Sequence, residues 1–335
     1  MSRATPSPSR LEVDVEGRQL RLSNLDKVLY PATGFTKGQV IDYYTRVAPV
    51  LLAHLAGRAL TLRRFPDGVD GEGFFAKNAP AHRPDWIPTV SIASQRRGRE
   101  TIDYIVVNEL AALVWCANLA ALELHAPMAR ADGAHNPTAV VFDLDPGPPA
   151  DIVQCCEVAL WLRAALEELG LEALPKTSGG KGLQLYLPLD GSVQDDQAKA
   201  FALALAEVLE RTHPDRVVSR MSKALRPGKV LVDWSQNDSA KTTIAPYSLR
   251  AREGPTVSTP LTWDEVQQTF ERGDSDALRF EAPAVLDRVA RDGDLFAAVL
   301  EQGQLLPALG DPAHARARQR EESPYGKRGP RKPRS

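Results

Sequence analysis

An apolar run that carries two aspartates constrains this chain more than any other feature. Residues 139–148, AVVFDLDPGP, have the pattern of a buried strand that ends at a Pro-Gly-Pro turn. Because residues i and i+2 of a strand point to the same face, Asp143 and Asp145 project together, roughly 6 to 7 Å apart at the backbone. Two carboxylates at that separation repel each other unless a cation or a proton lies between them. The strand therefore predicts a site that requires a positive charge.

A third aspartate lies on another apolar run. Asp233 is part of VLVDWSQ, residues 230–236. Carboxylates are the hard oxygen ligands that suit Mg²⁺ and Mn²⁺, and two such ions about 3.5 to 4 Å apart form a clamp for in-line phosphoryl transfer. Cations would also offset the repulsion between Asp143 and Asp145. The residues alone leave a second interpretation open, in which the three aspartates form structural ion pairs with nearby arginines.

The composition is that of a soluble globular protein, with 43% hydrophobic and 25% charged residues among 335. This length suffices for one large domain or two modest ones. The chain has no run of 18 apolar residues, and its first ten residues lack the apolar core of a secretory signal. We therefore expect no membrane association, a short disordered lead over residues 1–10 and a cytoplasmic location. The three cysteines, Cys116, Cys155 and Cys156, suggest neither a disulfide framework nor a zinc site.

Charge is distributed unevenly along the chain. Residues 316–335 contain eight Lys and Arg against two Glu, a net charge of +6, so the other residues carry −8 of the formal net charge of −2. A tail rich in Pro, Gly, Arg and Lys is expected to be disordered, and such basic tails often contact nucleic acid. A solvated tail that aids solubility is the alternative. We therefore expect one catalytic domain over residues 11–300 and a basic tail over residues 301–335.

Helix and strand signals alternate along the folded region. Helical periodicity predicts three long helices, over residues 35–57, 151–170 and 194–213. Thr36 is expected to cap the first of these helices, and Pro49 to break it. Strand-like patterns predict two hairpins, with turns at Glu16–Gly17 and at Gly179–Gly180. Helices interleaved with hairpins predict an α+β fold, in which a mixed or antiparallel sheet is flanked by helices.

The glycine-rich turn is a candidate phosphate site. Its segment TSGGKGLQLYL, residues 177–187, is not a Walker A motif, because Lys181 precedes a glycine and an alternating strand. Gly179 and Gly180 still allow close approach of the backbone to a ligand. Ser178 offers a hydroxyl group and Lys181 a charge for a phosphate. A tight hairpin whose lysine is merely solvated is the alternative.

Basic and aromatic residues lie near these motifs. Arg226, Lys241 and Arg250 gather around the third aspartate, where they suit a triphosphate, although an exposed charged rim would have the same sequence. The pair Phe74–Phe75 lies among glycines, close to Lys77. The two rings either pack into the core or form a stacking platform for a base beside a phosphate contact.

Taken together, these motifs resemble a known family. The chain is similar to the polymerase domain of bacterial ligase D, of the archaeo-eukaryotic primase superfamily, in the segments DKVLYPATG, FFAKNAP, LELHAP, FDLDPGP, TSGGKGLQLY, KVLVDWSQN and KTTIAPYSLRAR. The resemblance covers about residues 10–300 and implies the primase-polymerase architecture, with a catalytic core like that of an RNA-recognition motif. We find no segment typical of a ligase or nuclease module. The chain therefore also resembles standalone primase-polymerases, including those associated with ligase C.

The resemblance implies roles for individual residues. Asp143, Asp145 and Asp233 match the family's ligands of two catalytic metal ions. These ions are Mn²⁺ or Mg²⁺, with Mn²⁺ favoured. His125, Ser178, Lys181 and Arg250 match positions at which the family binds the incoming nucleotide. Arg226 and Gln236 match further active-site positions of the family. Lys241 is added to the nucleotide-binding candidates because of its place in the sequence. Asn24, Lys27 and Lys37 match the family's pocket for a 5′-phosphate on the downstream DNA strand. Phe74 and Phe75 match the aromatic pair that contacts the template bases in the family, and Lys77 lies close to them in the sequence.

One position departs from the family pattern. The ligase-fused members usually have His in a GLHLY segment, whereas this chain has Gln184, which we include among the nucleotide-binding candidates. The zinc site of replicative primase subunits is absent from the sequence, so no zinc is expected.

These features predict a template-directed nucleotidyltransferase that extends a primer across short gaps or breaks, and the resemblance implies a preference for ribonucleotides. The expected partners are a DNA primer–template with a 5′-phosphate, NTPs or dNTPs, and, from the resemblance, an ATP-dependent DNA ligase and Ku. We expect a monomer associated with the nucleoid. Two other classes stay open. A metal-dependent nuclease or phosphodiesterase would use the same acids without a triphosphate set, and a silent nucleic-acid-binding module would need no three acids on core strands.

Overall fold

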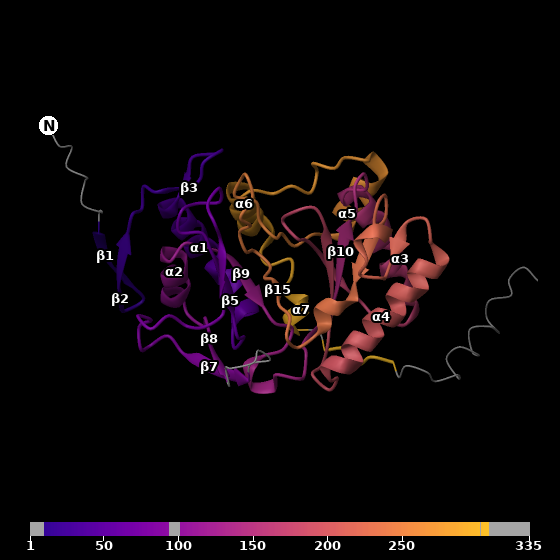
Figure 1. Ribbon diagram of the computed structural model, residues 1–335, viewed down its shortest axis with the longest axis horizontal. Helices are drawn as coiled ribbons and strands as arrows, with labels where there is room; N and C mark the ends of the chain where they lie inside the picture. The colour runs from indigo at the N-terminus through magenta and orange to yellow at the C-terminus, as the bar shows by residue number, and fades with distance from the viewer. Residues whose placement is uncertain (1–9, 94–100, 302, 308–335) are drawn as a thin grey trace, which may run out of the picture. The chain divides into compact units, whose positions relative to one another are not determined.

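The computed structural model describes residues 10–93, 101–301 and 303–307 (Figure 1). The lead expected over residues 1–10 and the tail expected over residues 301–335 lie almost wholly outside these ranges. The described residues up to Leu305 belong to one compact unit. Its helices and largely antiparallel sheets confirm the predicted α+β class. No helix among the described residues is both long and apolar enough to cross a membrane.

The five-stranded sheet holds the aspartates. Its strands lie in the order β11 (Leu174–Thr177), β12 (Leu183–Pro188), β10 (Ala139–Pro146), β14 (Val230–Asp233) and β13 (Val217–Val218). All neighbours are antiparallel except β13 and β14. Helices α3 (Ile152–Glu168) and α4 (Asp195–Thr212) pack against β10, beside the sheet (Figure 1). They bury apolar side chains such as Leu162 and Phe201. The other face of the sheet carries Asp143 and also packs Val141 and Tyr186 against Phe296.

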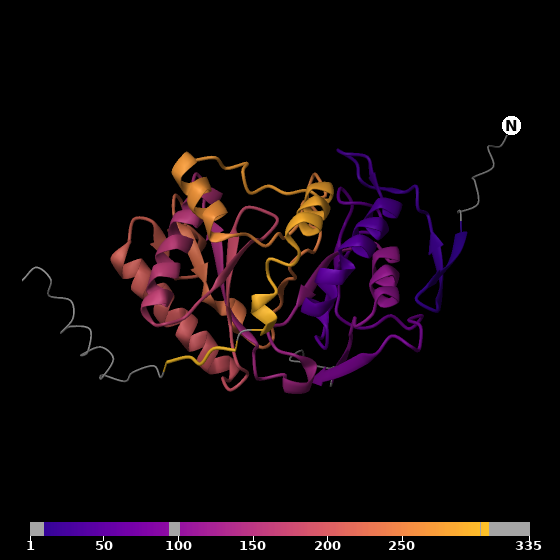
Figure 2. The same cartoon turned by 180° about the vertical axis from the view of Figure 1, so that it is seen from behind.

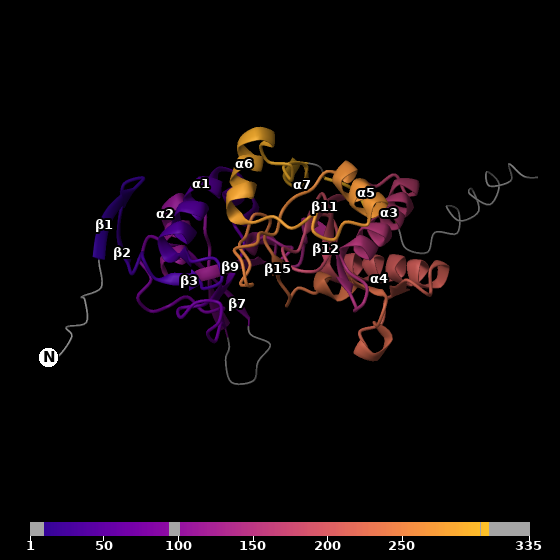
Figure 3. The same cartoon turned by 90° about the horizontal axis from the view of Figure 1, so that it is seen from above.

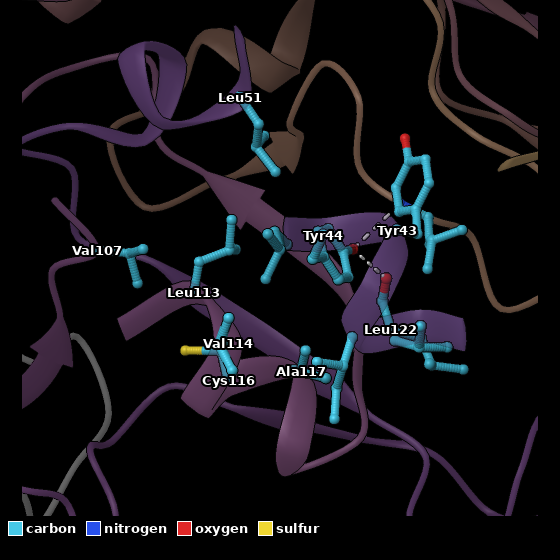
Figure 4. Close-up of a cluster of buried hydrophobic side chains, with 14 of the residues drawn as sticks. Tyr43, Tyr44, Leu51, Val107, Leu113, Val114, Cys116, Ala117 and Leu122 are labelled. Carbon is cyan, nitrogen blue, oxygen red and sulfur yellow. Dashed lines mark hydrogen bonds between the residues drawn. The ribbon is translucent and has the colours of Figure 1, made fainter. Parts of the chain in front are cut away.

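The second sheet has four antiparallel strands. They lie in the order β15 (Thr243–Ile244), β9 (Ala121–Ala126), β5 (Thr61–Arg64) and β6 (Phe74–Ala76). Helices α1 (Lys37–Leu55) and α2 (Leu110–Asn118) pack on each other beside this sheet. Their apolar side chains form the core in Figure 4, where the hydroxyl group of Tyr44 donates a 2.7 Å hydrogen bond to the carbonyl of Leu122. This bond ties α1 to β9, the strand that carries His125.

Helix α1 is continuous, so the predicted break at Pro49 is wrong. Thr36 caps the helix as predicted, with a capping box that includes Gln39. Pro49 lies on the exposed face, where water can satisfy the carbonyl group that loses its hydrogen bond. The opposite face buries Val47 and Leu51, and this packing stabilises both halves of the helix.

Three short hairpins complete the N-terminal half: β1 (Arg10–Val15) with β2 (Arg18–Ser23), β3 (Val28–Tyr30) with β4 (Phe35–Thr36), and β7 (Thr89–Ala93) with β8 (Thr101–Ile105). The predicted turn between β1 and β2 is confirmed, with positive φ angles at Glu16 and Gly17. Short 3-10 helices lie at η1 (Ala131–Gly133), η2 (Lys223–Leu225) and η3 (Trp234–Asn237).

The C-terminal helices connect the two sheets. Helix α5 (Trp263–Arg272) packs on α3, α6 (Ala282–Asp292) packs on α1, and α7 (Ala298–Glu301) packs on β12. Figures 2 and 3 show this orange-to-yellow segment running from one sheet to the other. Asp294 fixes it to the core, since it accepts hydrogen bonds from Tyr247 at 2.7 Å and from His54 at 2.9 Å. The two sheets are therefore held in one unit around the site.

Candidate active site

The five-stranded sheet brings the three aspartates together. Asp143 on β10 is the cross-strand partner of Asp233 on β14 and of Gln184 on β12. Asp145 lies two residues further along β10 and shares the face of Asp143. Asp233 is buried, Asp143 is half-buried and Asp145 lies at the exposed end. The acids thus form a graded patch that runs from the sheet interior to solvent.

Crowding among these acids disfavours their charged forms. Burial, with the charges of Asp145 and Asp233, raises the pKa of Asp143 to about 7, although a hydrogen bond from Gln184 opposes the shift. Desolvation and the charge of Asp233 also raise the pKa of Asp145, against the opposing charges of Arg226 and Arg250. A cation at this patch would be stabilised by the same charges that now repel each other.

The donor set suits divalent cations, because it consists of carboxylates on one face. Each acid also has local partners. Asp143 accepts from Gln184 at 3.1 Å, and Asp233 accepts from the backbone N–H of Ser235 at 2.9 Å and from Gln236 at 3.1 Å. No group of three or more His, Cys, Asp or Glu side chains in the described ranges has the arrangement of a formed metal site. The chemistry of the acids fits such ions, and their side chains would have to converge to hold them.

The glycine turn lies next to this patch. Its backbone closes through a 2.9 Å hydrogen bond from Ser178 N–H to the carbonyl of Gly182. The hydroxyl oxygen of Ser178 accepts the N–H groups of Gly180 at 3.3 Å and of Gly182 at 3.2 Å. Gly179 has φ +66°, and a Cβ atom there would lie 2.7 Å from the backbone nitrogen of Ser258, so only glycine fits. The turn is therefore a built loop rather than a loose hairpin, and Lys181 is exposed on it.

A buried glutamate that the sequence analysis did not single out organises the cationic side of the site. Glu123 on β9 is 1% exposed and accepts from Arg250 at 3.1 Å, His125 at 2.9 Å and Arg63 at 3.3 Å. Arg250 also donates to the carbonyl of Ser178, which joins this cluster to the glycine turn. Burial alone would raise the pKa of Glu123, but the hydrogen bond from His125 and the charges of its cationic neighbours hold it well below its usual range.

Other predicted residues surround the acids. Gln236 contacts Asp233, and Lys241 donates to Ser235, whose hydroxyl group donates to Asp233 at 2.5 Å. Arg226 donates to the carbonyl of Met221 at 2.8 Å, and its buried Nε has no hydrogen-bond partner within the part of the chain that is described. A guanidinium donor without a partner, close enough to influence Asp145, suits an anionic ligand.

The phenylalanine pair does not pack into the core. Phe74 is 46% exposed and Phe75 is 57% exposed, and both line a groove of about 1060 Å³ together with Lys77. The guanidinium of Arg64 lies 5.2 Å from the Phe74 ring, and Phe75 lies edge-on to His125 at 5.6 Å. The exposed rings and their cationic neighbours favour the stacking interpretation over the core staple.

The three residues expected at a 5′-phosphate lie around the start of α1. Lys37 is 6% exposed and donates to the carbonyl of Ser23 at 2.6 Å. Burial, then the charges of Lys27 and Arg64, lowers the pKa of Lys37 to about 8. Asn24 forms a turn whose carbonyl accepts the N–H of Lys27 at 3.0 Å. A buried lysine crowded by other cations suits an anion, and Lys27 also pairs with Asp67 at 2.9 Å.

The sequence analysis missed both Glu123 and Lys176, although each had a local signal. Glu123 lies two residues before His125 on an apolar strand, so the two side chains had to share a face. Lys176 is a lysine within the buried strand β11, where it is fully buried. The partners of both residues come from distant segments, and no sequence pattern identifies them.

Comparison with known proteins shows that this chain is similar to one domain of bacterial LigD proteins. The family described as the LigD primase-polymerase domain matches residues 36–296. The multifunctional non-homologous end joining protein LigD of Mycolicibacterium smegmatis is 47% identical over 281 residues, which are 83% of this chain and 36% of that protein. The bifunctional LigD protein of Bacillus subtilis is 33% identical over 279 residues, or 83% of this chain and 44% of that protein.

A solved structure matches the fold as well. The polymerase domain of Mycobacterium tuberculosis ligase D, in complex with DNA, aligns with a TM-score of 0.78 and 44% identity. The alignment covers 84% of this chain and 98% of that domain. The chain thus spans less than half the length of the LigD proteins of M. smegmatis and B. subtilis, yet it accounts for nearly all of the solved domain.

Proposed function

This chain belongs to the LigD primase-polymerase domain family, and from that premise we propose that it is a template-directed nucleotidyltransferase that fills short gaps or extends primers at DNA breaks. The observation that carries the proposal is the junction of two sites. The acid patch of Asp143, Asp145 and Asp233 lies beside the turn of Ser178, which Arg250 joins to Glu123. Acids suit metal-assisted phosphoryl transfer, and the cationic side suits a triphosphate.

The proposed reaction joins a primer to a nucleotide. The 3′-hydroxyl oxygen of the primer loses its proton to solvent and attacks the α-phosphorus of the nucleotide, a new P–O bond forms, and the bond to the β-phosphate breaks to release pyrophosphate. Asp143, Asp145 and Asp233 would hold divalent metal ions, which would supply charge stabilisation at the phosphorus oxygens and lower the pKa of the primer hydroxyl group. Arg250, Arg226 and Lys181 are the candidates to bind the triphosphate, and Phe74 and Phe75 to stack on template bases.

The finer parts of the proposal rest on the resemblance and on the local chemistry. We propose Mn²⁺ as the favoured ion, ribonucleotides as the favoured substrates and a 5′-phosphate contact at Lys27 and Lys37. We also propose that the protein acts with a DNA ligase and Ku, and that it acts as a monomer at the nucleoid. Its catalytic domain is proposed to span residues 11–300 and to be followed by a basic tail. The end-joining names of the relatives support a role in break repair.

Primer extension tests the proposal. The protein is incubated with a gapped primer–template, NTPs and Mn²⁺. Extension of the primer supports a polymerase, and shortening supports a nuclease. A primer of unchanged length supports a silent binding module. Asp145→Ala is expected to abolish extension, because the transition state loses several kcal/mol of stabilisation. Most of the affinity for DNA should remain. Asp42→Ala, at an exposed residue of α1, is the matched control. Near-normal extension by Asp145→Ala would contradict the assignment.

A further inference from the structure

A buried lysine stands in line with the acid patch. Lys176 on β11 pairs across the strands with Gln184 on β12, Gln184 pairs with Asp143 on β10, and Asp143 pairs with Asp233 on β14. Cross-strand partners share a face of the sheet. These four residues therefore form one transverse row, with a lysine at one end and two acids at the other.

The environment of Lys176 requires three donors. Its side chain is fully buried, and its Nζ contacts three oxygens: Gln184 Oε1 at 2.6 Å, Ser258 Oγ at 2.6 Å and the carbonyl of Ile244 at 3.1 Å. The carbonyl can only accept. The hydroxyl group of Ser258 already donates to the carbonyl of Thr177 at 2.8 Å, so towards Lys176 it accepts. Only an ammonium group has three protons for three acceptors.

The Gln184 amide is oriented to match its two neighbours. With its oxygen bound to Lys176, its NH₂ group faces Asp143, and Nε2 donates to Asp143 Oδ1 at 3.1 Å. The reversed amide would place two N–H donors against the ammonium group and a carbonyl oxygen against a carboxylate. Both contacts would be repulsive in a buried setting, where an unmade hydrogen bond is costly.

We propose that Lys176 is a positioning residue for the acid patch, acting through Gln184. It holds an N–H donor on Asp143 through the Gln184 amide and so keeps that carboxylate in place for a divalent cation. This inference deepens the proposed polymerase function and rests on it. It also gives a physical role to Gln184, where the resembling family usually has His. An imidazole that accepts from Lys176 through one ring nitrogen would present N–H on the other.

Five variants test this relay. Lys176→Met removes the donor, Gln184→Met removes the amide, a double variant combines them, and Gln184→His restores an N–H donor. Ser258→Ala is the matched control, because it removes another partner of Lys176 and leaves Gln184 intact. For each variant, Mn²⁺ affinity is measured by titration with a thermal-unfolding readout, and kcat and KM by primer extension on gapped DNA.

We expect Lys176→Met and Gln184→Met each to weaken Mn²⁺ binding about tenfold, the usual effect of losing a group that supports a metal ligand. A similar fall is expected in kcat, with the nucleotide KM within about threefold. The double variant should bind Mn²⁺ no more weakly than the single variant with the lower affinity, because both changes break the same chain of hydrogen bonds. Gln184→His should restore most of the affinity. Ser258→Ala should lower the unfolding temperature and leave Mn²⁺ affinity within about threefold.

Three outcomes would overturn the inference: unchanged Mn²⁺ affinity in Lys176→Met, equal losses in Ser258→Ala and Lys176→Met, or fully additive losses in the double variant. If Lys176→Met does not fold, equal Mn²⁺ affinities of Gln184→Met and Gln184→His would overturn it instead. A wild type that extends no primer would overturn the proposed function. The Mn²⁺ affinities would still decide whether Lys176 positions the acid patch.

Discussion

At the residue scale, Glu123 connects the two halves of the site. It pairs across the strands with Arg63, which pairs in turn with Phe75, so the three residues form a second transverse row. The guanidinium of Arg63 lies 5.4 Å from the Phe75 ring. Since Glu123 also binds His125 and Arg250, one carboxylate contacts both the side chains beside Phe75 and the candidate triphosphate ligands.

Glu123→Gln tests this connection, because it keeps the size of the side chain and removes its charge. We expect the nucleotide KM to rise about tenfold or more, since Arg250 and His125 lose the carboxylate that orients them. The free energy of unfolding should fall by about 3 kcal/mol, as is typical when one partner of a buried ion pair is removed. Steady-state extension and urea unfolding measure the two effects. Glu253→Gln, at an exposed position, is the control, and an unchanged KM in Glu123→Gln would refute the role.

The proposed preference for ribonucleotides can also be tested at single residues. Gln184 is engaged on both sides by Lys176 and Asp143, whereas the Ser178 hydroxyl accepts two N–H groups and still has a proton to donate. We expect ATP to be preferred over dATP opposite template T by about ten- to a hundredfold in kcat/KM, and Ser178→Ala to reduce that ratio. Single-nucleotide insertion measures it. Equal use of dATP would reject the preference. Equal losses for both nucleotides in Ser178→Ala would show that Ser178 does not read the sugar.

The residue scale also shows how far the sequence reached. The shared face of Asp143 and Asp145 follows from strand periodicity, and the structure places both on β10 as expected. The partners of Glu123 do not follow from it, because Arg250 lies 127 residues further along the chain. A buried ion pair of this kind depends on tertiary packing, which local patterns do not encode.

At the element scale, local chemistry predicted how elements begin and end. Thr36 and Asp151 both form the capping boxes expected of helix N-termini, and Gly179 has the positive φ that the tight turn requires. Pro49 misled the prediction because its effect depends on exposure, which the sequence of a single helix does not give. An element's ends are set by neighbours in sequence, and its continuity is set by what it packs against.

The start of α1 gives a prediction for pH. The pKa of Lys37 is about 8, lowered from 10.5 by burial and by neighbouring cations. Its ammonium form, which is the form proposed to bind a phosphate, is therefore present below pH 8 and is lost as the pH rises through 8. The extra affinity that a 5′-phosphate gives to gapped DNA should fall about tenfold between pH 7 and pH 9. Fluorescence anisotropy, with and without the phosphate, measures this difference.

Lys37→Arg provides the control for that experiment, because a guanidinium group stays charged across this range. Its phosphate-dependent affinity should be nearly constant from pH 7 to pH 9. An equally steep loss in Lys37→Arg would assign the titration to another group. No effect of the 5′-phosphate at pH 7 in the wild type would reject the pocket itself.

At the scale of the whole molecule, the α+β class was predictable and the strand order was not. The pairing of β11 with β12 follows from the glycine turn between them. The pairing of β10 with β14, which brings Asp233 beside Asp143, joins segments separated by α3, the β11–β12 hairpin, α4, β13 and η2. Many strand orders bury the same apolar faces, so periodicity does not choose among them. The acid patch therefore depends on a strand order that periodicity does not predict and that the structure shows.

The same patch affects the stability of the whole unit. The pKa of Asp143 is raised to about 7, so the folded protein binds more protons than the unfolded chain between pH 4 and pH 7. Stability is therefore lost as the pH rises through that window, and the cost is full above pH 7. Bound cations would reverse it, because a ligand that binds only the folded state stabilises by about 2.7 kcal/mol at a hundred times its Kd.

Asp145→Asn should consequently have opposite effects with and without metal. In EDTA at pH 8 it removes one of the repelling charges, so we expect its unfolding temperature to exceed that of the wild type by about 2 to 4 °C. With saturating Mn²⁺ the wild type should gain about 5 °C or more, while Asp145→Asn gains much less, so the order of the two proteins reverses. Differential scanning calorimetry measures both states. If Asp145→Asn unfolds below the wild type in EDTA, the acids do not repel each other, and if both proteins gain equally from Mn²⁺, Asp145 is not a ligand.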